Sequence, residues 1–254
     1  MKGDFLEAHN YISSFVPDYI YKYYSLFDDK EKDEQRLCSL REGSNWFAES
    51  SEQNDPFDMK QAYFDEEGFS KEDVDEVNHI LNHFQNHTLL CSFTGCNEYT
   101  LPMWATYANS HKGYCIRYKV EDKKRFFMVF YENNRISIGS LAKRLVELNR
   151  KRIEYNNVVN YYYVYIILLL LSMKHTSWKH ENEFRLMMPS EESGKNIPMK
   201  CFNITPTDLY IGLYCSSENK EKIIDICREK LKCNVYQAKK SKKTFLEFEK
   251  ITEK

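Results

Sequence analysis

Acidic side chains alternate with other residues in the segment that runs from Trp178 to Pro189. Glu181, Glu183 and Arg185 are spaced two residues apart. If this segment is extended, alternate side chains share a face, so both carboxylates and the guanidinium would lie together. Two carboxylates this close repel each other and need a cation, solvent or a ligand, and Arg185 is the nearest cation. Such a pair can divide its roles, one carboxylate stabilising positive charge in a reacting group and the other orienting or deprotonating a nucleophile.

The same pattern is also typical of an edge strand whose charged face is solvated. Three other segments contain candidate residues that have ordinary structural explanations when taken alone. Ser92 lies on a predicted strand, and Lys22 interrupts an aromatic one, as a surface lysine can. Trp104 and Tyr107 are three residues apart on one face of a predicted helix, which is typical of an aromatic core contact.

Three histidines, His79, His83 and His87, follow one another at intervals of four residues. On a helix, two adjacent ones can chelate Zn²⁺ or Ni²⁺, but the third lies one turn beyond the reach of a single ion. The apolar face of this helix lies mostly elsewhere, so exposed histidines are the simpler interpretation and we assign no metal ligands. The sequence contains no glycine-rich phosphate loop, no H-E-x-x-H and no G-x-S-x-G motif.

Composition limits the classes of protein that remain. The chain has 254 residues, with 36 Lys and Arg against 38 Asp and Glu and a formal charge of −2. This balance argues against a protein that binds nucleic acid through a broad basic face, and 42% hydrophobic residues exclude wholesale disorder. Eight cysteines without a C-x-x-C pair, and a beginning unlike a secretion signal, predict a reduced cytoplasmic protein.

Helices and strands alternate irregularly along the predicted chain. Apolar residues at helical spacing, together with an N-cap pattern at Ser70, predict helices over residues 6–15, 31–41, from 70 onward, 103–110, 140–174 and 220–231. Alternating or β-branched and aromatic runs predict strands over residues 18–25, 45–48, 88–94, 113–120, 126–131, 183–188, 209–214, 234–238 and 244–248. Without a regular βαβ rhythm, we expect one α+β domain over residues 1–254.

The uncharged residues 156–173 approach the length of a membrane span. Three Asn, four Tyr and the lack of a basic cluster on one side make this segment a poor one. We therefore predict a wholly buried central helix and no stable membrane insertion, with a membrane-inserting effector as the alternative.

Seven short motifs, taken in order, resemble a bacterial family known only as a domain of unknown function. The ordered set of motifs, over residues 21–213, is more specific for that family than any one motif alone. The motifs are Tyr21-Lys22-Tyr23, Trp46-Phe47-Ala48, Asn54-Asp55-Pro56-Phe57, Cys91-Ser92-Phe93, Met103-Trp104 to Tyr107-Ala108, Lys112-Gly113 and Trp178-x-x-Glu181-x-Glu183-x-Arg185.

The run from Glu181 to Pro189 is also similar to the E-x-E strand of mono-ADP-ribosyltransferases, in which a hydrophobic strand and often Pro follow the second Glu. Those enzymes carry a basic or aromatic residue on the first strand and a Ser-Thr-Ser strand in the middle. Here Lys22 or Tyr23 and the run Ser92-Phe93-Thr94 fall in that order, although Lys replaces the usual Arg or His and Phe interrupts the hydroxyls. The resemblance implies a split sandwich of mixed and antiparallel sheets with peripheral helices and one long buried helix.

The resemblance also implies NAD as substrate and assigns roles to residues. Glu183 would bond the ribose hydroxyl and face the oxocarbenium-like charge that develops when the nicotinamide–ribose bond breaks. Glu181 would orient or activate the acceptor. The residues that would contact NAD or support the glutamates are Lys22, Tyr23, Ser92, Trp104, Tyr107, Arg185 and Asn54.

The function expected from this resemblance is that of an NAD-consuming ADP-ribosyltransferase-like enzyme, acting as an intracellular toxin or anti-phage effector. Its macromolecular acceptor, protein or nucleic acid, and any regulatory partner are not specified. Two alternatives remain. One is a metal-dependent nuclease that binds Mg²⁺ through Asp55, Glu181 and Glu183, and the other is a non-enzymatic module that senses a nucleotide.

Overall fold

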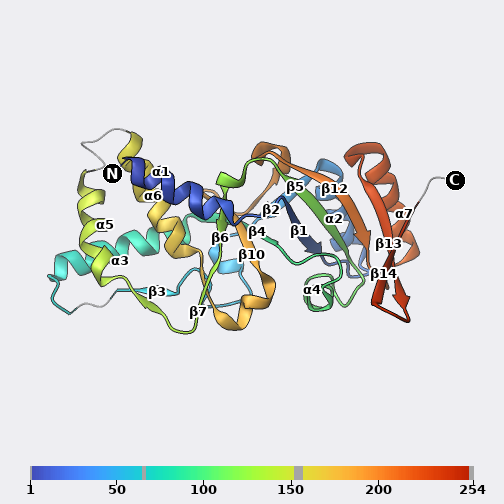
Figure 1. The fold of residues 1–254 in the computed structure, drawn as a ribbon, viewed down its shortest axis with the longest axis horizontal. Helices are drawn as coiled ribbons and strands as arrows, with labels where there is room; N and C mark the ends of the chain where they lie inside the picture. Colours follow the sequence, from blue (N-terminus) through green and yellow to red (C-terminus); the bar gives the residue numbers. More distant parts are fainter. Residues whose placement is uncertain (1, 65–66, 152–156, 252–254) are drawn as a thin grey trace.

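The computed structural model describes residues 2–64, 67–151 and 157–251, in which one large sheet is flanked by helices (Figure 1). Neighbouring strands of this sheet are antiparallel, except for the parallel pair β12 and β13. In spatial order the strands are β14 (Phe245–Lys250), β13 (Asn234–Ser241), β12 (Ile204–Ile211), β5 (Tyr114–Val120), β1 (Tyr19–Tyr24), β4 (Thr88–Thr94), β10 (Glu183–Pro189) and β6 (Phe126–Met128).

The predicted α+β class is confirmed, with a mostly antiparallel sheet and several helices. The helices are α1 (Lys2–Ser14), α2 (Lys30–Glu42), α3 (Lys71–Asn86), α4 (Leu101–Tyr107), α5 (Gly139–Lys151), α6 (Asn157–Leu171) and α7 (Ser217–Ile226). Three short ladders complete the described part: β2 (Ser44–Phe47) with β11 (Lys195–Pro198), β3 (Ala62–Tyr63) with β8 (Ile136–Ser137), and β7 (Phe130–Glu132) with β9 (Met173–His175).

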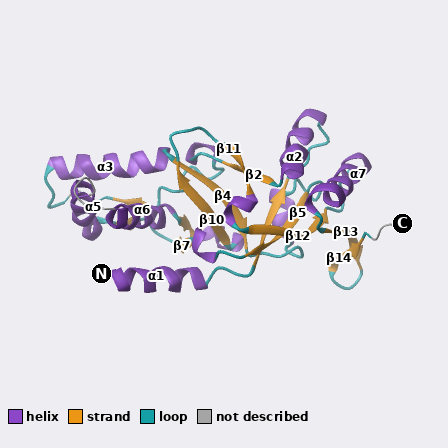
Figure 2. Cartoon of the chain, turned by 90° about the horizontal axis from the view of Figure 1, so that it is seen from above, coloured by secondary structure: helices purple, strands orange, loops and turns teal. Residues whose placement is uncertain are grey.

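Helices cover both faces of the large sheet. On one face, Leu37 of α2 and Ile223 of α7 pack in a single hydrophobic cluster with inward residues of the strands, among them Ile116. On the other face, Trp104 of α4 packs in a separate cluster that includes Cys115. Successive residues of β5 therefore belong to opposite clusters, as the predicted alternation of this strand requires. Figure 2 shows α2 and α7 side by side over the same end of the sheet.

A group of three helices, α3, α5 and α6, extends beyond one end of the sheet (Figures 1 and 2). Their apolar faces form a further cluster, to which Leu90 of β4 and Met187 of β10 contribute from the sheet. The N-cap predicted at Ser70 is confirmed, since its side chain accepts the Asp73 N–H at 3.2 Å. This cluster connects the helices to the two strands that carry the candidate site.

The predicted buried helix is present, but it lies among these helices and not at the centre of the sheet. The side chains of residues 162–171 are all buried or partly buried. Residue 156, at the predicted start, and the junction 152–155 inside the predicted helix over 140–174 lie outside the described residues. None of the helices in the described residues has both the length and the apolar character needed to cross a membrane.

Some predicted boundaries are wrong because tertiary pairing overrides local pattern. The helix predicted to reach residue 174 ends at Leu171, and the chain then forms β9, which pairs with β7. The strand predicted over residues 126–131 divides for a related reason. The N–H of Val129 donates to Glu183 of β10, whereas that of Phe130 donates to Ser172. As a consequence, Lys174 belongs to β9, the strand that pairs with β7.

Candidate active site

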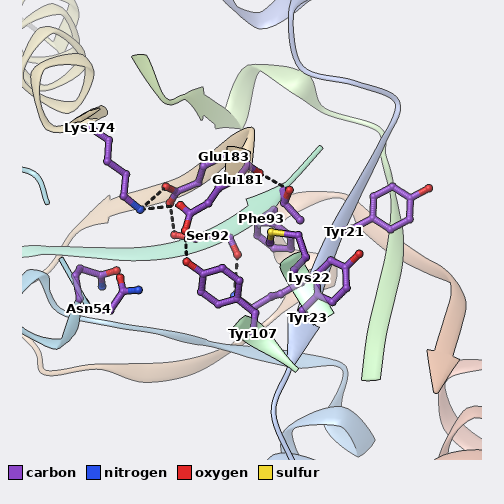
Figure 3. A pocket seen from close by; sticks show the side chains of 13 residues that line it. Tyr21, Lys22, Tyr23, Asn54, Ser92, Phe93, Tyr107, Lys174, Glu181 and Glu183 are labelled. Carbon is purple, nitrogen blue, oxygen red and sulfur yellow. Dashed lines mark hydrogen bonds and ion pairs between the residues drawn. The ribbon is translucent and has the colours of Figure 1, made fainter. Parts of the chain in front are cut away.

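The large sheet opens between β1 and β4. Tyr21 and Thr94 form the one facing pair of these two strands in the described structure, whereas β4 and β10 pair along their full lengths. The Lys22 ammonium spans the opening and donates to the Ser92 carbonyl at 2.8 Å, so this backbone oxygen has a partner where the ladder lacks one. A cavity of about 170 Å³ lies at this opening (Figure 3).

Most of the predicted site residues come together around this cavity. Glu181 and Glu183 are 4% and 5% exposed, and both carboxylates lie close to the ammonium of Lys174. Trp104 and Arg185 do not line the cavity in the described structure. The predicted residues that line it are Lys22, Tyr23, Asn54, Ser92, Tyr107, Glu181 and Glu183.

Glu183, the first residue of β10, accepts hydrogen bonds from three side chains. Ser92 Oγ donates to Oε1 at 2.5 Å from the neighbouring strand. Arg185 donates through Nε to Oε1 at 2.8 Å and through Nη2 to Oε2 at 3.0 Å, which is the bidentate arrangement. Lys174 Nζ donates to Oε2 at 3.2 Å. Both oxygens are therefore occupied by donors that stabilise the ionised form.

The ionisation of Glu183 follows from this environment. Burial raises the pKa of its carboxyl, but the Arg185 guanidinium, the Lys174 ammonium and the Ser92 hydroxyl outweigh burial and lower the pKa to about 2. Burial lowers the pKa of Lys174, but the surrounding carboxylates outweigh this and raise it. At neutral pH the site therefore contains a fixed carboxylate charge paired with fixed cations.

Acid should weaken this part of the structure in a defined pH range. Because the folded-state pKa of Glu183 lies below its ordinary value of 4.5, its contribution to stability is complete above about pH 4.5 and declines as pH falls toward 2. The contribution at neutral pH is on the order of 3 kcal/mol. Urea unfolding should therefore show Glu183→Gln less stable than wild type by this amount at pH 7, with the difference shrinking below pH 4.5. A difference that is independent of pH would contradict the ion pairing.

Glu181 reaches the site from a different local structure than its spacing predicts. It ends a 3₁₀ helix, Thr176–Glu181, and Asn182 then adopts a left-handed conformation with φ 45°. The expectation that one extended segment carries both glutamates is thus wrong, although their side chains still converge. Glu181 Oε2 accepts from Lys174 at 2.8 Å, and Oε1 accepts from the Tyr107 hydroxyl. The Thr94 hydroxyl donates to the Glu181 carbonyl and fixes the turn.

Tyr107 is the link between helix α4 and this carboxylate pair. Burial, followed by the contact with Glu181, raises the pKa of its hydroxyl, and a hydrogen bond with Asn54 acts in the opposite direction. The hydroxyl therefore keeps its proton at neutral pH and acts as a donor to Glu181. Figure 3 shows Tyr107 below Glu181, with Asn54 to its left.

Lys174 is the main site residue that sequence reasoning missed. Its Nζ lies 2.8 Å from Glu181, 3.2 Å from Glu183 and 3.6 Å from Asp58, so three carboxylates share one ammonium. The available signal was its position as the first charged residue after the uncharged run 156–173. We placed it at the end of a helix, where a charged residue needs no explanation.

Arg185 supports the site from inside the protein. Its side chain is 0% exposed, and besides Glu183 it contacts Asp58, at 2.8 Å from Nη1 and 2.9 Å from Nη2. Because β10 is paired on both sides, with β4 and β6, the edge-strand interpretation is wrong. Arg185 is thus enclosed and positions Glu183. The sequence had instead suggested that Arg185 contacts NAD.

Trp104 and Tyr23 belong mainly to the hydrophobic core. Trp104 is 0% exposed, donates from Nε1 to the Glu98 carbonyl at 2.7 Å, and packs edge-on against Tyr23. The Tyr23 hydroxyl donates to the Asn97 carbonyl at 2.5 Å. Burial explains this arrangement, because an enclosed indole or phenol needs a partner for its polar atom. Tyr23 lines the cavity with its ring, whereas Trp104 is shielded from it.

The turn over residues 54–58 contributes Asp58 to the site, and not Asp55, which the sequence suggested as a Mg²⁺ ligand. Asp55 Oδ1 accepts the Phe57 N–H at 2.9 Å and so forms an Asx turn. Asp55 does not line the cavity, whereas Asp58 extends to Arg185 and Lys174. The turn therefore connects to the site through a residue that the sequence did not single out.

The charges around the cavity determine what it can stabilise. Three carboxylates, Asp58, Glu181 and Glu183, lie against two cations, Lys174 and Arg185, and this cluster has a formal charge of −1. Lys22, which also lines the cavity, balances that charge. Arg185 does not line the cavity, whereas Glu181, Glu183 and Lys174 do, so the two carboxylates face the cavity with one ammonium beside them. Such a carboxylate pair can stabilise positive charge that develops on a ligand beside it during reaction.

Comparison with known proteins finds a similarity over part of the chain. Residues 103–186 match the model of a family described as "Protein of unknown function (DUF2971)". Comparison with curated proteins and with solved structures gives no match. The matched segment contains Tyr107, Lys174, Glu181, Glu183 and Arg185.

Proposed function

We propose that the cavity between β1 and β4 binds the nicotinamide–ribose end of NAD and cleaves the bond between them, in the manner of an ADP-ribosyltransferase. The observation that carries this proposal is the ionised Glu183, bonded by Ser92 from the adjacent strand and accompanied by Glu181 in one buried cavity. The opening of the sheet at this point is what an ADP-ribosyltransferase-like split sandwich requires.

Cleavage of NAD develops positive charge next to the carboxylates of the site. Nicotinamide in NAD is a pyridinium cation, and when the glycosidic bond breaks its electron pair goes to the ring nitrogen while positive charge develops on the ribose. Glu183 stabilises that charge, and a ribose hydroxyl takes the place of Ser92 or Lys174 as one of its donors. Glu181, whose two oxygens accept from Tyr107 and Lys174, retains acceptor capacity to orient the incoming nucleophile.

A second cavity supports a dinucleotide in preference to a smaller ligand. It measures about 180 Å³ and shares Lys22, Gln53 and Ser92 with the first cavity. Arg36 lies on the wall of this second cavity, so Lys22 and Arg36 supply positive charge beside the first cavity, which contains Glu181 and Glu183. NAD has the complementary order of charges, a cationic ring followed by a pyrophosphate, which basic side chains bind. Each cavity alone is smaller than the roughly 300–1,000 Å³ of a typical ligand pocket.

Removal of the Lys22 charge should weaken NAD binding. We expect Lys22→Met to raise the dissociation constant about tenfold, in line with the loss of one charge-assisted contact to phosphate. Calorimetric titration of NAD in a buffer containing EDTA measures this effect. The matched control is Lys112→Met, which removes an exposed lysine paired with Asp28 at 3.0 Å and should bind as wild type does. Equal affinities for all three proteins would exclude Lys22 from the binding site.

The two alternative functions predict different outcomes. A nuclease that uses Mg²⁺ needs a cation among the carboxylates, but Lys174 Nζ lies where they converge. NAD cleavage should therefore proceed in excess EDTA, whereas Mg²⁺-dependent hydrolysis of nucleic acid would favour the nuclease. A nucleotide-sensing module would bind NAD without releasing nicotinamide. A role as toxin or anti-phage effector, with a protein or nucleic acid as acceptor, belongs to the first proposal.

A further inference from the structure

Two histidines and a glutamate meet on the surface of the helical group, away from the cavity. The ligating atoms of His83, His87 and Glu191 all lie within 4.8 Å of one another. We propose that these three side chains bind a divalent transition-metal ion of the Zn²⁺, Co²⁺ and Ni²⁺ class, for which imidazole and carboxylate are suitable ligands.

Two segments that are distant in sequence bring the ligands together. His83 and His87 stand one turn apart near the end of α3, with their rings stacked at 4.5 Å between centroids. Glu191 follows β10, and the N–H of the preceding Ser190 donates to the His87 carbonyl at 2.8 Å. This backbone hydrogen bond fixes the start of the loop against the helix, so the carboxylate is placed beside the imidazoles.

The hydrogen bond of His87 identifies which ring nitrogen is a donor. His87 Nδ1 lies 2.8 Å from the His83 carbonyl oxygen, which can only accept, so Nδ1 carries a hydrogen. Metal-binding histidines are oriented in this way by a backbone carbonyl on the second nitrogen. His87 Nε2 then faces Glu191 Oε2 at 3.2 Å. The lone pair of imidazole Nε2 and a carboxylate oxygen are both donor atoms that a divalent transition-metal ion binds.

The distances are compatible with a metal ion. Two ligand atoms at the zinc bond lengths of about 2.0–2.1 Å are about 3.3 Å apart in tetrahedral geometry. The His87–Glu191 distance of 3.2 Å matches this value, and His83 Nε2 lies 3.9 Å from Glu191 Oε1. All three side chains are partly or fully exposed, so water can complete the coordination. His79 is one turn farther away, with 6.4 Å between its ring centroid and that of His83.

Titration of the purified protein with ZnCl₂ and with CoCl₂ tests the site. We expect one ion per chain, and His83→Gln, His87→Gln and Glu191→Gln should each weaken binding at least about tenfold. His79→Gln is the matched control, because it removes a histidine from the same face of the same helix, and it should bind as wild type does. Thermal unfolding of each variant without metal would show that the substitutions leave the fold intact.

Three results would overturn the proposal. The first is the absence of saturable binding, and the second is equal weakening by His79→Gln and His87→Gln. The third is a thiolate charge-transfer band in the Co²⁺ spectrum, since all eight cysteines are free and a cysteine site would compete for the ion.

Discussion

Glutamine in place of Glu183 should reduce nicotinamide release from NAD at least about 100-fold, the loss typical when a group that stabilises transition-state charge is removed. The amide keeps the shape of the side chain but carries no negative charge to oppose the developing cation. The remaining carboxylate, Glu181, is held by Tyr107 and Lys174, so it does not move into the position of Glu183. Chromatography of NAD incubations at pH 7 measures the rate.

Loss of stability must be separated from loss of catalysis, because Glu183 is also part of a buried ion pair. Asp208→Asn is the matched control. Asp208 is another buried carboxylate, on β12, paired with Arg117 at 2.5 Å, and it does not line the cavity. We expect this variant to lose stability but keep its turnover per folded molecule. If both variants lost turnover equally, Glu183 would have no specific role in the reaction.

Methionine in place of Arg185 should lower the free energy of unfolding by about 3–5 kcal/mol, the usual cost of removing one partner of a buried ion pair. The substitution leaves Asp58 and Glu183 without their bidentate donor in a region that excludes water. Lys174 alone would then face three carboxylates. For a domain whose total stability is about 5–15 kcal/mol, this loss is a large fraction. Urea unfolding monitored by tryptophan fluorescence measures it.

An exposed arginine provides the comparison. Arg41 contacts Glu34 at 3.4 Å, and both side chains are exposed, so Arg41→Met should change the free energy of unfolding by less than about 1 kcal/mol. A loss of less than 1 kcal/mol for Arg185→Met as well would contradict the described charge cluster, because a buried carboxylate pair cannot lose its cation without cost.

Local patterns predicted the strands that carry the site. The boundaries predicted for β4 are those of the structure, and β10 begins at Glu183 as predicted. Both strands are short apolar runs bounded by polar turns, so pattern and tertiary pairing agree. The Ser70 N-cap was predictable for the same reason, since its hydrogen bond lies within four residues of sequence.

Other features depend on contacts between distant segments and were not predictable from local pattern. Lys174 is a site residue because β9 pairs with β7, more than 40 residues earlier in the sequence. Asp58 comes from a turn and belongs to the site through its ion pair with Arg185. Alternation placed Arg185 correctly on the face of Glu183, but spacing alone does not reveal which residues of a face remain open to a ligand.

The most direct test of the central claim is the reaction of the wild-type protein with NAD in EDTA, first alone and then with cell extract as a source of acceptors. Free nicotinamide is measured against time. The proposed function predicts nicotinamide in amounts that increase with protein concentration. Folded protein that leaves NAD intact under both conditions would contradict it.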